Sequence, residues 1–159
     1  MPADVNDAIG FTAEEIVTGE PTRTARLKWV IVAEESAGIG LMVNAVACIA
    51  ASTGAAVTAL IGPPGRDASG QRHPGLPWAG CTVLTATSAA LTEIRAKAAA
   101  SDGVLVVDMP RSAQTNRVYD DYLAELAETK PEDLAVSAVS IIGPRNKISK
   151  LVKNLSLLR

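Results

Sequence analysis

Gly103-Val-Leu-Val-Val-Asp108, followed further along by Ala138-Val-Ser-Ile-Ile-Gly-Pro144, decides the fold class of this chain. Each apolar run is too short for a buried helix and is rich in β-branched residues, so both runs are predicted to be interior strands. Interior strands that alternate with helices are typical of α/β proteins. Asp108 stands where its strand leaves the core, which is where such proteins place binding residues. The two runs therefore indicate both a fold class and a place to look for a site.

The size and composition of the chain point to one domain. At 159 residues it is long enough to bury a core without support from disulfides or metal ions. Hydrophobic residues make up 48% of the sequence but aromatic residues only 3%, so the core is predicted to consist of Ala, Val, Ile and Leu. The 15 basic and 17 acidic residues nearly balance, which argues against a dedicated nucleic-acid-binding domain.

Two further features bear on the cellular compartment. Cys48 and Cys81 lie in apolar segments without a paired spacing, and the first residues are acidic and form no apolar leader. We therefore expect a cytoplasmic protein with reduced cysteines. The longest apolar stretch, residues 39–51, is interrupted by Asn44 and is shorter than the roughly 20 residues that cross a bilayer. No membrane segment is predicted.

Apolar runs separated by turn residues divide the chain into elements. Residues 1–26 are polar and lack a sustained period, so we interpret them as a partly disordered N-terminal arm ahead of a single α/β domain, residues 27–159. The predicted strands are 27–33, 57–61, 81–85, 104–108 and 136–142. The predicted helices are 40–52, 88–100, 116–128 and a short basic helix, 145–153. This alternation predicts a layered α/β structure with a mostly parallel sheet.

The segment 62–77 differs from the rest of the domain. It contains four prolines and four glycines and is predicted to hold no regular element. Loops of this length inside compact domains are usually functional or disordered. The single histidine of the chain, His73, lies in this segment with Arg66, Asp67 and Arg72 close by in the sequence. This loop is therefore a candidate part of a functional site.

Three connections are expected to meet over one edge of the sheet. If the strands that end at residues 33, 61 and 108 are parallel, the segments that follow them emerge together, where α/β proteins bind ligands. Glu34, Glu35 and Ser36 begin the first of these segments. The predicted site residues are Asn44, Arg66, Asp67, His73, Asp108, Arg111 and Ser112. His73 would carry protons because the reference pKa of histidine lies near neutrality, Asp67 or Asp108 would orient it, and Arg66 or Arg111 would contact an anion.

Structural roles are the alternative for several of these residues. Asp108 and Ser112 would then cap the next helix or turn. Asn44, a polar residue on an apolar helix, either faces the cleft or bonds to a neighbouring backbone group. His73 would be an ordinary surface group. A Ser-His-Asp triad lacks the Gly-x-Ser-x-Gly elbow that would hold its serine, so it is not predicted.

Gly38 and Gly40 form a turn between the first strand and the first helix. Val43 stands where a dinucleotide-binding motif needs its third glycine, so nicotinamide binding is not predicted, although the helix start could accept an anion. One histidine and two scattered cysteines give no zinc spacing, and we predict no metal and no cofactor. The terminal residues 145–159 carry five basic residues and no acid, which favours a solvated face or, alternatively, a phosphate-binding surface.

Several motifs taken together resemble a known fold. The chain resembles the type II peptidyl-tRNA hydrolases in four places. These are Lys28-Trp-Val-Ile-Val-Ala33, the turn at Gly38 and Gly40, the strand that ends at Asp108 with Ser112 after it, and the C-terminal part from Ala138-Val-Ser-Ile-Ile-Gly-Pro144 through Leu155-Ser-Leu-Leu158. With the loop Asp67-Ala-Ser-Gly70-Gln-Arg-His73-Pro-Gly75, the chain is more similar to an uncharacterised bacterial family of that fold, over residues 22–159. The resemblance implies a three-layer α/β/α domain with a four- or five-stranded mixed sheet, and a homodimer.

The chain departs from the hydrolases where their chemistry is carried. They have lysines in the turn and a histidine on the helix behind it, whereas this chain has Ile39 and Leu41 in the turn and Cys48 near the helical position. A leucine cannot polarise an ester carbonyl. We therefore predict binding, extending to hydrolysis, of a small polar or anionic molecule in the cleft. The alternatives are a divergent peptidyl-tRNA hydrolase with tRNA as partner, and a non-catalytic module that docks a partner through the basic final helix.

Overall fold

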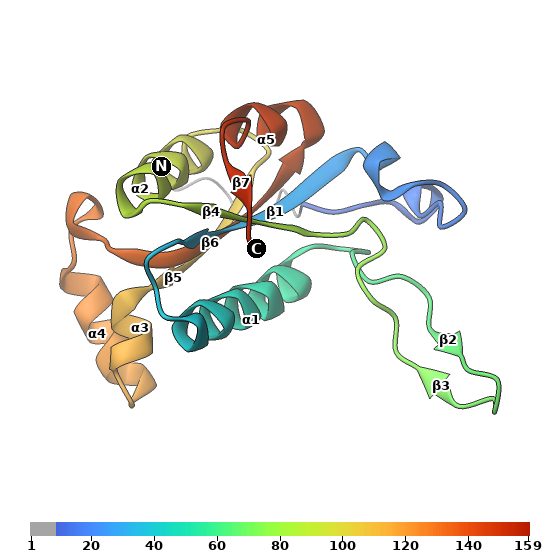
Figure 1. The fold of residues 1–159 in the computed structure, drawn as a ribbon, viewed down its shortest axis with the longest axis horizontal. Coiled ribbons are helices and arrows are strands. Elements are labelled where there is room, and N and C mark those ends of the chain that lie inside the picture. The colour runs from blue at the N-terminus through green and yellow to red at the C-terminus, as the bar shows by residue number, and fades with distance from the viewer. Residues whose placement is uncertain (1–8) are drawn as a thin grey trace.

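The computed structural model describes residues 9–159, which form three layers with a five-stranded sheet in the middle. Helix α1 (Ile39–Ala56) covers one face of the sheet, and helices α2 (Ser88–Ala99) and α5 (Arg145–Leu151) cover the other (Figure 1). The predicted layered α/β fold with a five-stranded mixed sheet is confirmed. The first eight residues of the predicted N-terminal arm lie outside the described residues.

The sheet has the strand order β5-β6-β1-β4-β7. Central strand β1 (Leu27–Glu34) runs parallel to β4 (Thr82–Ala86) and antiparallel to β6 (Val136–Pro144). At the edges, β5 (Leu105–Pro110) pairs antiparallel with β6, and the short β7 (Ser156–Leu157) pairs antiparallel with β4. The prediction of a mostly parallel sheet is therefore wrong, because three of the four neighbouring pairs are antiparallel.

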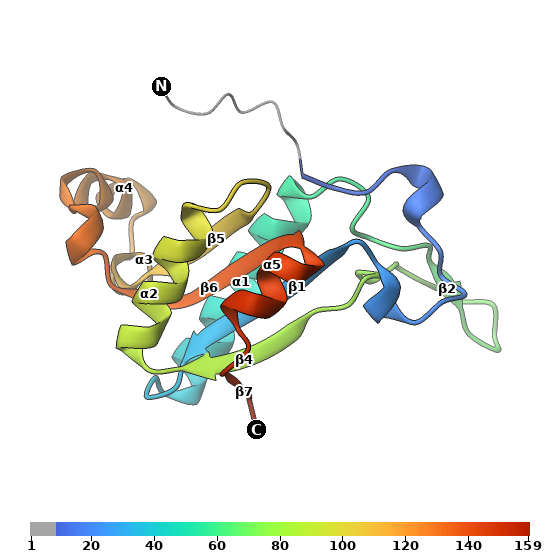
Figure 2. The same ribbon diagram turned by 90° about the horizontal axis from the view of Figure 1, so that it is seen from above.

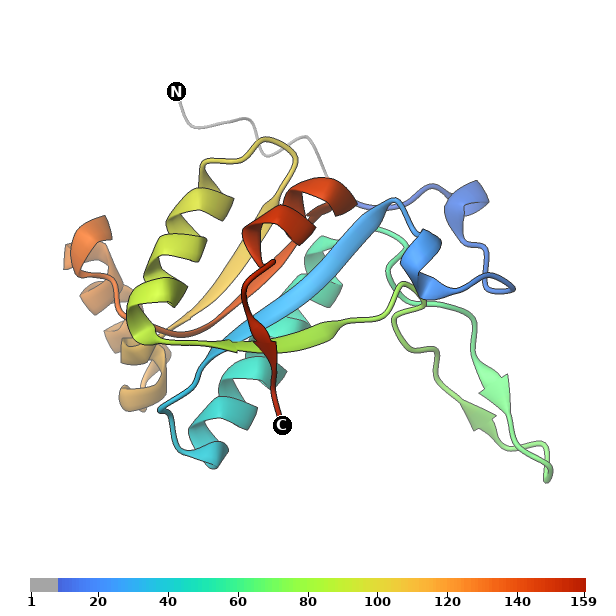
Figure 3. The same ribbon diagram turned by 45° about the horizontal axis from the view of Figure 1, so that its top comes forward.

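The connection between β5 and β6 explains this difference. Helices α3 (Arg111–Thr115) and α4 (Tyr119–Glu128) do not cross the sheet but stay at the end where β5 stops (Figure 3). Strand β6 therefore begins at that same edge and runs back along β5. Because β1, β4 and β5 share one direction, their carboxyl ends still meet at one edge of the sheet.

The apolar run 57–61 is not a strand of the sheet, which corrects the prediction. Helix α1 extends to Ala56, and Thr58 and Ile61 form only isolated bridges, with Gly10 and Pro77. The run still contributes buried side chains to one end of the core. Because α1 has already carried the chain back along the sheet, the segment 62–77 leaves from the edge opposite the carboxyl ends of β1, β4 and β5.

The side chains of β1 alternate between two apolar cores, as expected for a strand buried on both faces. Trp29 and Ile31 point toward α1, and Val30 and Val32 point toward α2 and α5. On the α1 side, Ala45 is fully buried, and such small residues let the helix lie close to the sheet. This is how a chain with few aromatic residues still builds two packed cores.

A buried chain of hydrogen bonds ties α1 to the middle of the sheet. Trp29 Nε1 donates to Ser140 Oγ at 2.8 Å, and Thr53 Oγ1 lies 2.7 Å from the same oxygen. Thr53 Oγ1 also donates its one hydrogen to the carbonyl of Ile49 at 2.7 Å. The hydroxyl hydrogen of Ser140 must therefore go to Thr53. Every polar group of this relay then has a partner, as buried groups require.

Part of the predicted N-terminal arm belongs to the packed domain. Phe11 is buried, and its ring centroid lies 4.7 Å from that of Trp78 in an edge-to-face arrangement. Gly10 pairs with Thr58 so closely that a Cβ at residue 10 would come within 2.6 Å of the Thr58 side chain. Glu15 and Arg26 form an ion pair at 2.5 Å. The core therefore begins before residue 27.

The remaining predicted helices are present with shifted bounds. Helix α2 begins at Ser88 as predicted, and Thr87 Oγ1 accepts a hydrogen bond from the Ala90 amide as its cap. The helix predicted over 116–128 begins at Tyr119, and that predicted over 145–153 ends at Leu151. Among the described helices, α1 is the one long and apolar enough to cross a membrane by length and composition, a test that core helices also pass.

The segment 62–77, called the arm below, projects from the body at the end opposite α3 and α4 (Figures 1 and 2). It holds two short strands, β2 (Gly65–Arg66) and β3 (Arg72–His73), that pair antiparallel. This two-residue ladder corrects the prediction that the segment has no regular element. All four residues of the ladder are exposed.

Candidate functional site

A cleft of about 350 Å³ opens at the edge where β1 and β5 end. Its wall is built from four parts of the chain: the end of β1, the start of α1, helix α3 and the start of β6. The lining residues are Glu34, Ser36, Ala37, Gly38, Leu41, Arg111, Gln114, Thr115 and Ser137. The structure thus places the cleft at the edge that the sequence predicted, with Arg111 and Gly38 in its wall.

Glu34 is the buried acid of the cleft, with 4% of its surface exposed. Its carboxylate accepts hydrogen bonds from Ser36 Oγ at 2.8 and 2.9 Å and from the Ser36 amide at 3.0 Å. Burial raises the pKa of this carboxyl, but the hydrogen bonds from Ser36 and the positive charge of Arg111 outweigh it, so the pKa lies below its usual range. Glu34 is therefore ionised at neutral pH.

Arg111 lies over the cleft with half of its side chain exposed. Its Nη2 is 3.7 Å from Glu34 Oε2, close enough for an ion pair but longer than a hydrogen bond. Within residues 9–159 the guanidinium makes no hydrogen bond to another protein group. Its donors are therefore available to a ligand.

Gln114 fixes the cleft by joining three elements. Its Nε2 donates to the Leu41 carbonyl at 2.9 Å and to Asn44 Oδ1 at 3.1 Å, both on α1. Its Oε1 accepts from Ser137 Oγ at 2.6 Å, on β6. Asn44 thus bonds to a side chain of the cleft wall, whereas the two predicted alternatives were the cleft itself or a backbone group.

The structure does not bring the predicted histidine into this cleft. His73 Nε2 lies 3.2 Å from Asp67 Oδ2, so these two residues do meet, but both are exposed on the arm. Hydrogen bonds from Ser69 and His73 lower the pKa of Asp67 to about 2. Arg66 donates to the Gly70 carbonyl within the same arm. The arm does not reach the cleft because residues 57–61 do not enter the sheet, so the arm leaves from the opposite edge.

Asp108 and Ser112 also lie outside the cleft wall. Asp108 Oδ2 accepts from Arg95 Nε of α2 at 2.6 Å, and the residue lines a separate pocket of about 370 Å³ beside Tyr119 and Tyr122. Ser112 lies on α3, where its carbonyl accepts hydrogen bonds from Asn116. Neither residue faces His73, so the predicted group of His73, Asp67 and Asp108 does not form. Gly40 lies in the first turn of α1, between the lining residues Gly38 and Leu41, but does not itself line the cleft.

Sequence reasoning missed Gln114 and Ser137 and left Glu34 without a role. Glu34 carries the same signal as Asp108, because each acid ends an apolar strand. Gln114 and Ser137 carry no such signal, because a polar residue on a short helix and a serine inside an apolar strand have many ordinary explanations.

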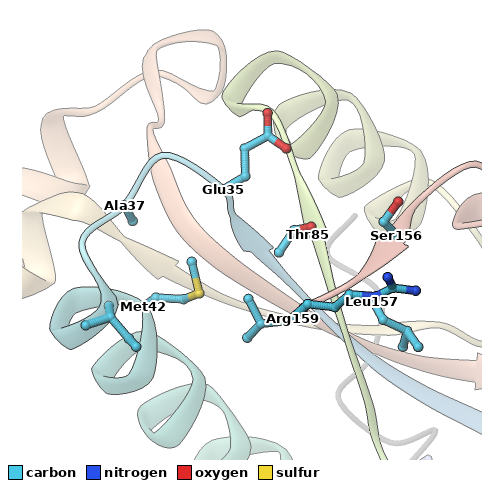
Figure 4. Close-up of a pocket in the computed structure, with 9 residues that line it drawn as sticks. Glu35, Ala37, Met42, Thr85, Ser156, Leu157 and Arg159 are labelled. Carbon is cyan, nitrogen blue, oxygen red and sulfur yellow. The ribbon is translucent and has the colours of Figure 1, made fainter.

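A second pocket of about 760 Å³ lies on the other side of the connection between β1 and α1 (Figure 4). Its walls come from that connection, β4 and the last residues of the chain, Ser156 to Arg159. Its charged side chains, Glu35 and Arg159, are exposed and form no ion pair with each other. We place the candidate site in the smaller cleft because hydrogen bonds there hold the polar groups in position.

Comparison with known proteins identifies the family. The sequence profile described as "Protein of unknown function (DUF2000)" matches residues 27–159, which is the domain from β1 onward. This chain belongs to the DUF2000 family. Membership of a family of unknown function, which the sequence motifs indicated, is thereby confirmed. No curated protein matches the sequence.

A solved structure shares the fold of this DUF2000 protein. It is that of Atu0240, a protein of unknown function from Agrobacterium tumefaciens, with a TM-score of 0.78 and 16% sequence identity. The match covers 84% of this chain and 98% of the Agrobacterium chain. At this identity the similarity shows the fold alone.

Proposed function

We propose that this DUF2000 protein binds a small molecule with an anionic group in the cleft beneath Arg111. Arg111 itself is the observation that carries the proposal. An arginine presents its N–H donors in a planar fork that fits a carboxylate or a phosphate. Here the fork is half exposed, stands over a cavity of about 350 Å³ and makes no hydrogen bond to another group within residues 9–159, although it lies 3.7 Å from the Glu34 carboxylate.

The start of α1 supports an anion in the same place. Gly38 and Leu41 line the cleft, so the first turn of the helix borders it. This turn has no acidic residue and no side-chain cap, which leaves its N–H groups without those partners. The positive end of the helix dipole adds to the charge of Arg111.

Glu34 favours a ligand that also carries a hydrogen-bond donor. Its carboxylate is ionised and buried beside the cleft, and Ser36 is its main partner. A hydroxyl or amino group close to the ligand's anionic group would complement Glu34 while Arg111 holds the anion. Hydroxy acids and amino acids are therefore the ligand class that fits best.

Binding is better supported than hydrolysis. The single histidine of the chain lies on the arm, so within one copy no imidazole serves the cleft. The lowered pKa of Glu34 makes it a weak base, and the Ser36 hydroxyl hydrogen-bonds to that carboxylate without a histidine to activate it. The hydrolytic part of the function therefore has less support than the binding part.

Amide chemical-shift mapping tests the proposal. The probes are phosphate, the common amino acids and short hydroxy acids, each acid compared with its neutral amide. We expect anionic probes to shift the amides of Gly38 and Gln114 and their neutral amides not to do so. Arg111→Met should weaken binding at least tenfold, whereas Arg23→Met, at an exposed arginine outside the cleft, should not. Equal binding by wild type and Arg111→Met would remove the proposal.

The finer fold assignment stays a proposal as well. We propose that the domain is related to the type II peptidyl-tRNA hydrolases, on the strength of the sequence motifs alone. Superposition on a hydrolase, with the strand order β5-β6-β1-β4 and its directions as the criterion, tests the relation. Release of an amino acid from an N-blocked aminoacyl-tRNA tests the activity separately.

A further inference from the structure

The outer face of α1 is exposed along the helix, and within residues 9–159 only Asn44 on this face bonds to another element, through Gln114 of α3. Met42, Ala45, Ile49 and Thr53 are buried against the sheet, and they lie on one side of the helix. The opposite side is exposed and consists of Gly40, Val43, Asn44, Ala47, Ala51 and Ala55. None of the 18 residues of α1 is charged. A surface helix normally carries charges on its outer side, so this face is unusual for one exposed to water.

The arm projects toward the same side of the molecule. It leaves near the C-terminal end of α1 and points away from the sheet on the α1 side (Figures 1 and 3). With about eight residues in each leg, the arm can reach roughly 25 Å beyond the body. A body packed against α1 would therefore also lie within reach of the arm.

We propose that the outer face of α1 is the interface of a two-fold symmetric homodimer. In this dimer the two α1 helices pack antiparallel, with the axis crossing α1 at its middle, near Ala47. Antiparallel packing sets the C-terminal end of one α1, where its arm begins, beside the N-terminal end of the other. The arm of each copy then lies at the end of its partner that carries the cleft.

Symmetry argues for a second copy rather than for a different protein. Each residue near a two-fold axis meets its own copy, so a charge there would face an identical charge. The uncharged face of α1 meets this requirement along its whole length. A membrane surface is less suitable, because interfacial helices carry Lys or Arg beside their apolar face and α1 has none.

Interface area and charge agree with this occupant. The face of α1 is roughly 27 Å long and 10 Å wide, which is too little alone for the roughly 800 Å² per partner of a stable interface. Each copy also buries one face of its own arm and the surface that receives the partner's arm. These two surfaces of roughly 260 Å² each, added to the face of α1, bring the area buried per copy to about 800 Å². Arg66 and Arg72 on the arm and Glu35 at the cleft end form no salt bridge within residues 9–159, so they can pair between copies.

The dimer would also deliver the missing histidine. The arm carries His73 with Asp67 hydrogen-bonded to it at 3.2 Å, and the partner's cleft holds Glu34 and Arg111. An imidazole brought to the cleft mouth would contact the bound molecule proposed above, a step that rests on the proposed function. The dimer itself does not depend on any ligand.

Analytical ultracentrifugation tests the dimer. At micromolar concentration we expect the wild type to sediment with a mass twice that of one chain, which is 16.4 kDa. Ala47→Glu, near the axis, should give a folded monomer. Ala96→Glu, at an exposed alanine of α2, is the matched control and should stay dimeric. A wild-type monomer would overturn the proposal, and a wild-type monomer that co-sediments with phosphatidylglycerol vesicles would assign the face to a membrane instead.

Cross-linking keeps the test independent of the folding of Ala47→Glu. In a Cys48→Ser/Cys81→Ser background, Ala47→Cys should oxidise to a covalent dimer, because the two Cα atoms lie close to the axis. A wild-type dimer in which Ala47→Cys does not cross-link would place the interface elsewhere and overturn the proposal. In the same background, a short bis-maleimide should join Ser69→Cys on one arm to Glu35→Cys on the partner when the two variants are mixed. An α1 dimer without this cross-link would refute only the position of the arm.

Discussion

Removing the Gln114 side chain should destabilise the protein by about 2 kcal/mol. Gln114→Ala deletes two hydrogen bonds to α1 and one from Ser137. Each hydrogen bond is worth about 0.5–1.5 kcal/mol net, and the two exposed bonds to α1 lie at the low end of that range. Ser137 is only 6% exposed, and its hydroxyl loses its acceptor. This loss contributes the larger share of the expected destabilisation. In a chain of this length the melting temperature should fall by about 4–8 °C.

Urea unfolding measures this loss. The midpoint should fall while the slope m stays constant, because the surface exposed on unfolding does not change. Gln71→Ala is the matched control, since Gln71 is exposed on the arm and only its backbone amide and carbonyl are bonded. It should change the free energy of unfolding by less than about 0.5 kcal/mol.

A double-mutant cycle decides whether the contact with Ser137 is responsible. Ser137→Ala should cost less in the Gln114→Ala background than in the wild type, with a coupling of about 1 kcal/mol. Additive effects would refute the reasoning, because they would mean that the two side chains do not depend on each other. A Gln114→Ala variant as stable as Gln71→Ala would refute it as well.

Three further predictions follow from the fold. Ser140→Ala should cost about 1–3 kcal/mol in urea unfolding, because the Trp29 indole N–H loses its acceptor, and the cost should shrink in a Trp29→Phe background; an unchanged cost would contradict the relay. Phe11→Ala should cost about 3–5 kcal/mol, and a loss below about 1 kcal/mol would show that residues 9–26 are not part of the core. The lowered pKa of Glu34 means that its stabilisation is present above pH about 4.3, the unfolded pKa, and disappears as pH falls through the folded pKa. Glu34→Gln should flatten that part of the stability–pH curve, and an unchanged curve would contradict the assignment.

Much of the fold could be predicted because its signals are local. The apolar runs 27–33, 81–85, 104–108 and 136–142 each became a strand with bounds shifted by one or two residues. The run 57–61 has a similar composition but was a false prediction. The run differs from the others because helix α1 extends to Ala56, so residues 57–61 lie beyond the edge of the sheet and do not become one of its strands. No pattern within 57–61 itself carries that information.

The direction of β6 could not be predicted for a related reason. A helical segment between two strands is usually a crossover, which makes the strands parallel. Here the segment is split at Asn116 into α3 and α4, and neither half packs across the sheet. Whether a helix crosses or stays at the edge depends on which surface buries its apolar side, and α4 buries none of its residues fully.

The candidate site shows why a signal at the end of a strand is not sufficient to find a functional acid. Glu34 and Asp108 carry equal signals, but their nearest cations differ. Asp108 accepts a full hydrogen bond from Arg95 at 2.6 Å. Glu34 lies 3.7 Å from Arg111 and takes its hydrogen bonds from Ser36 instead, which leaves the arginine without a hydrogen bond above an open cleft. The anion-binding group that we propose is therefore the arginine that lies farther from its acid, and such a distance between side chains on different elements cannot be deduced from the order of residues along the chain.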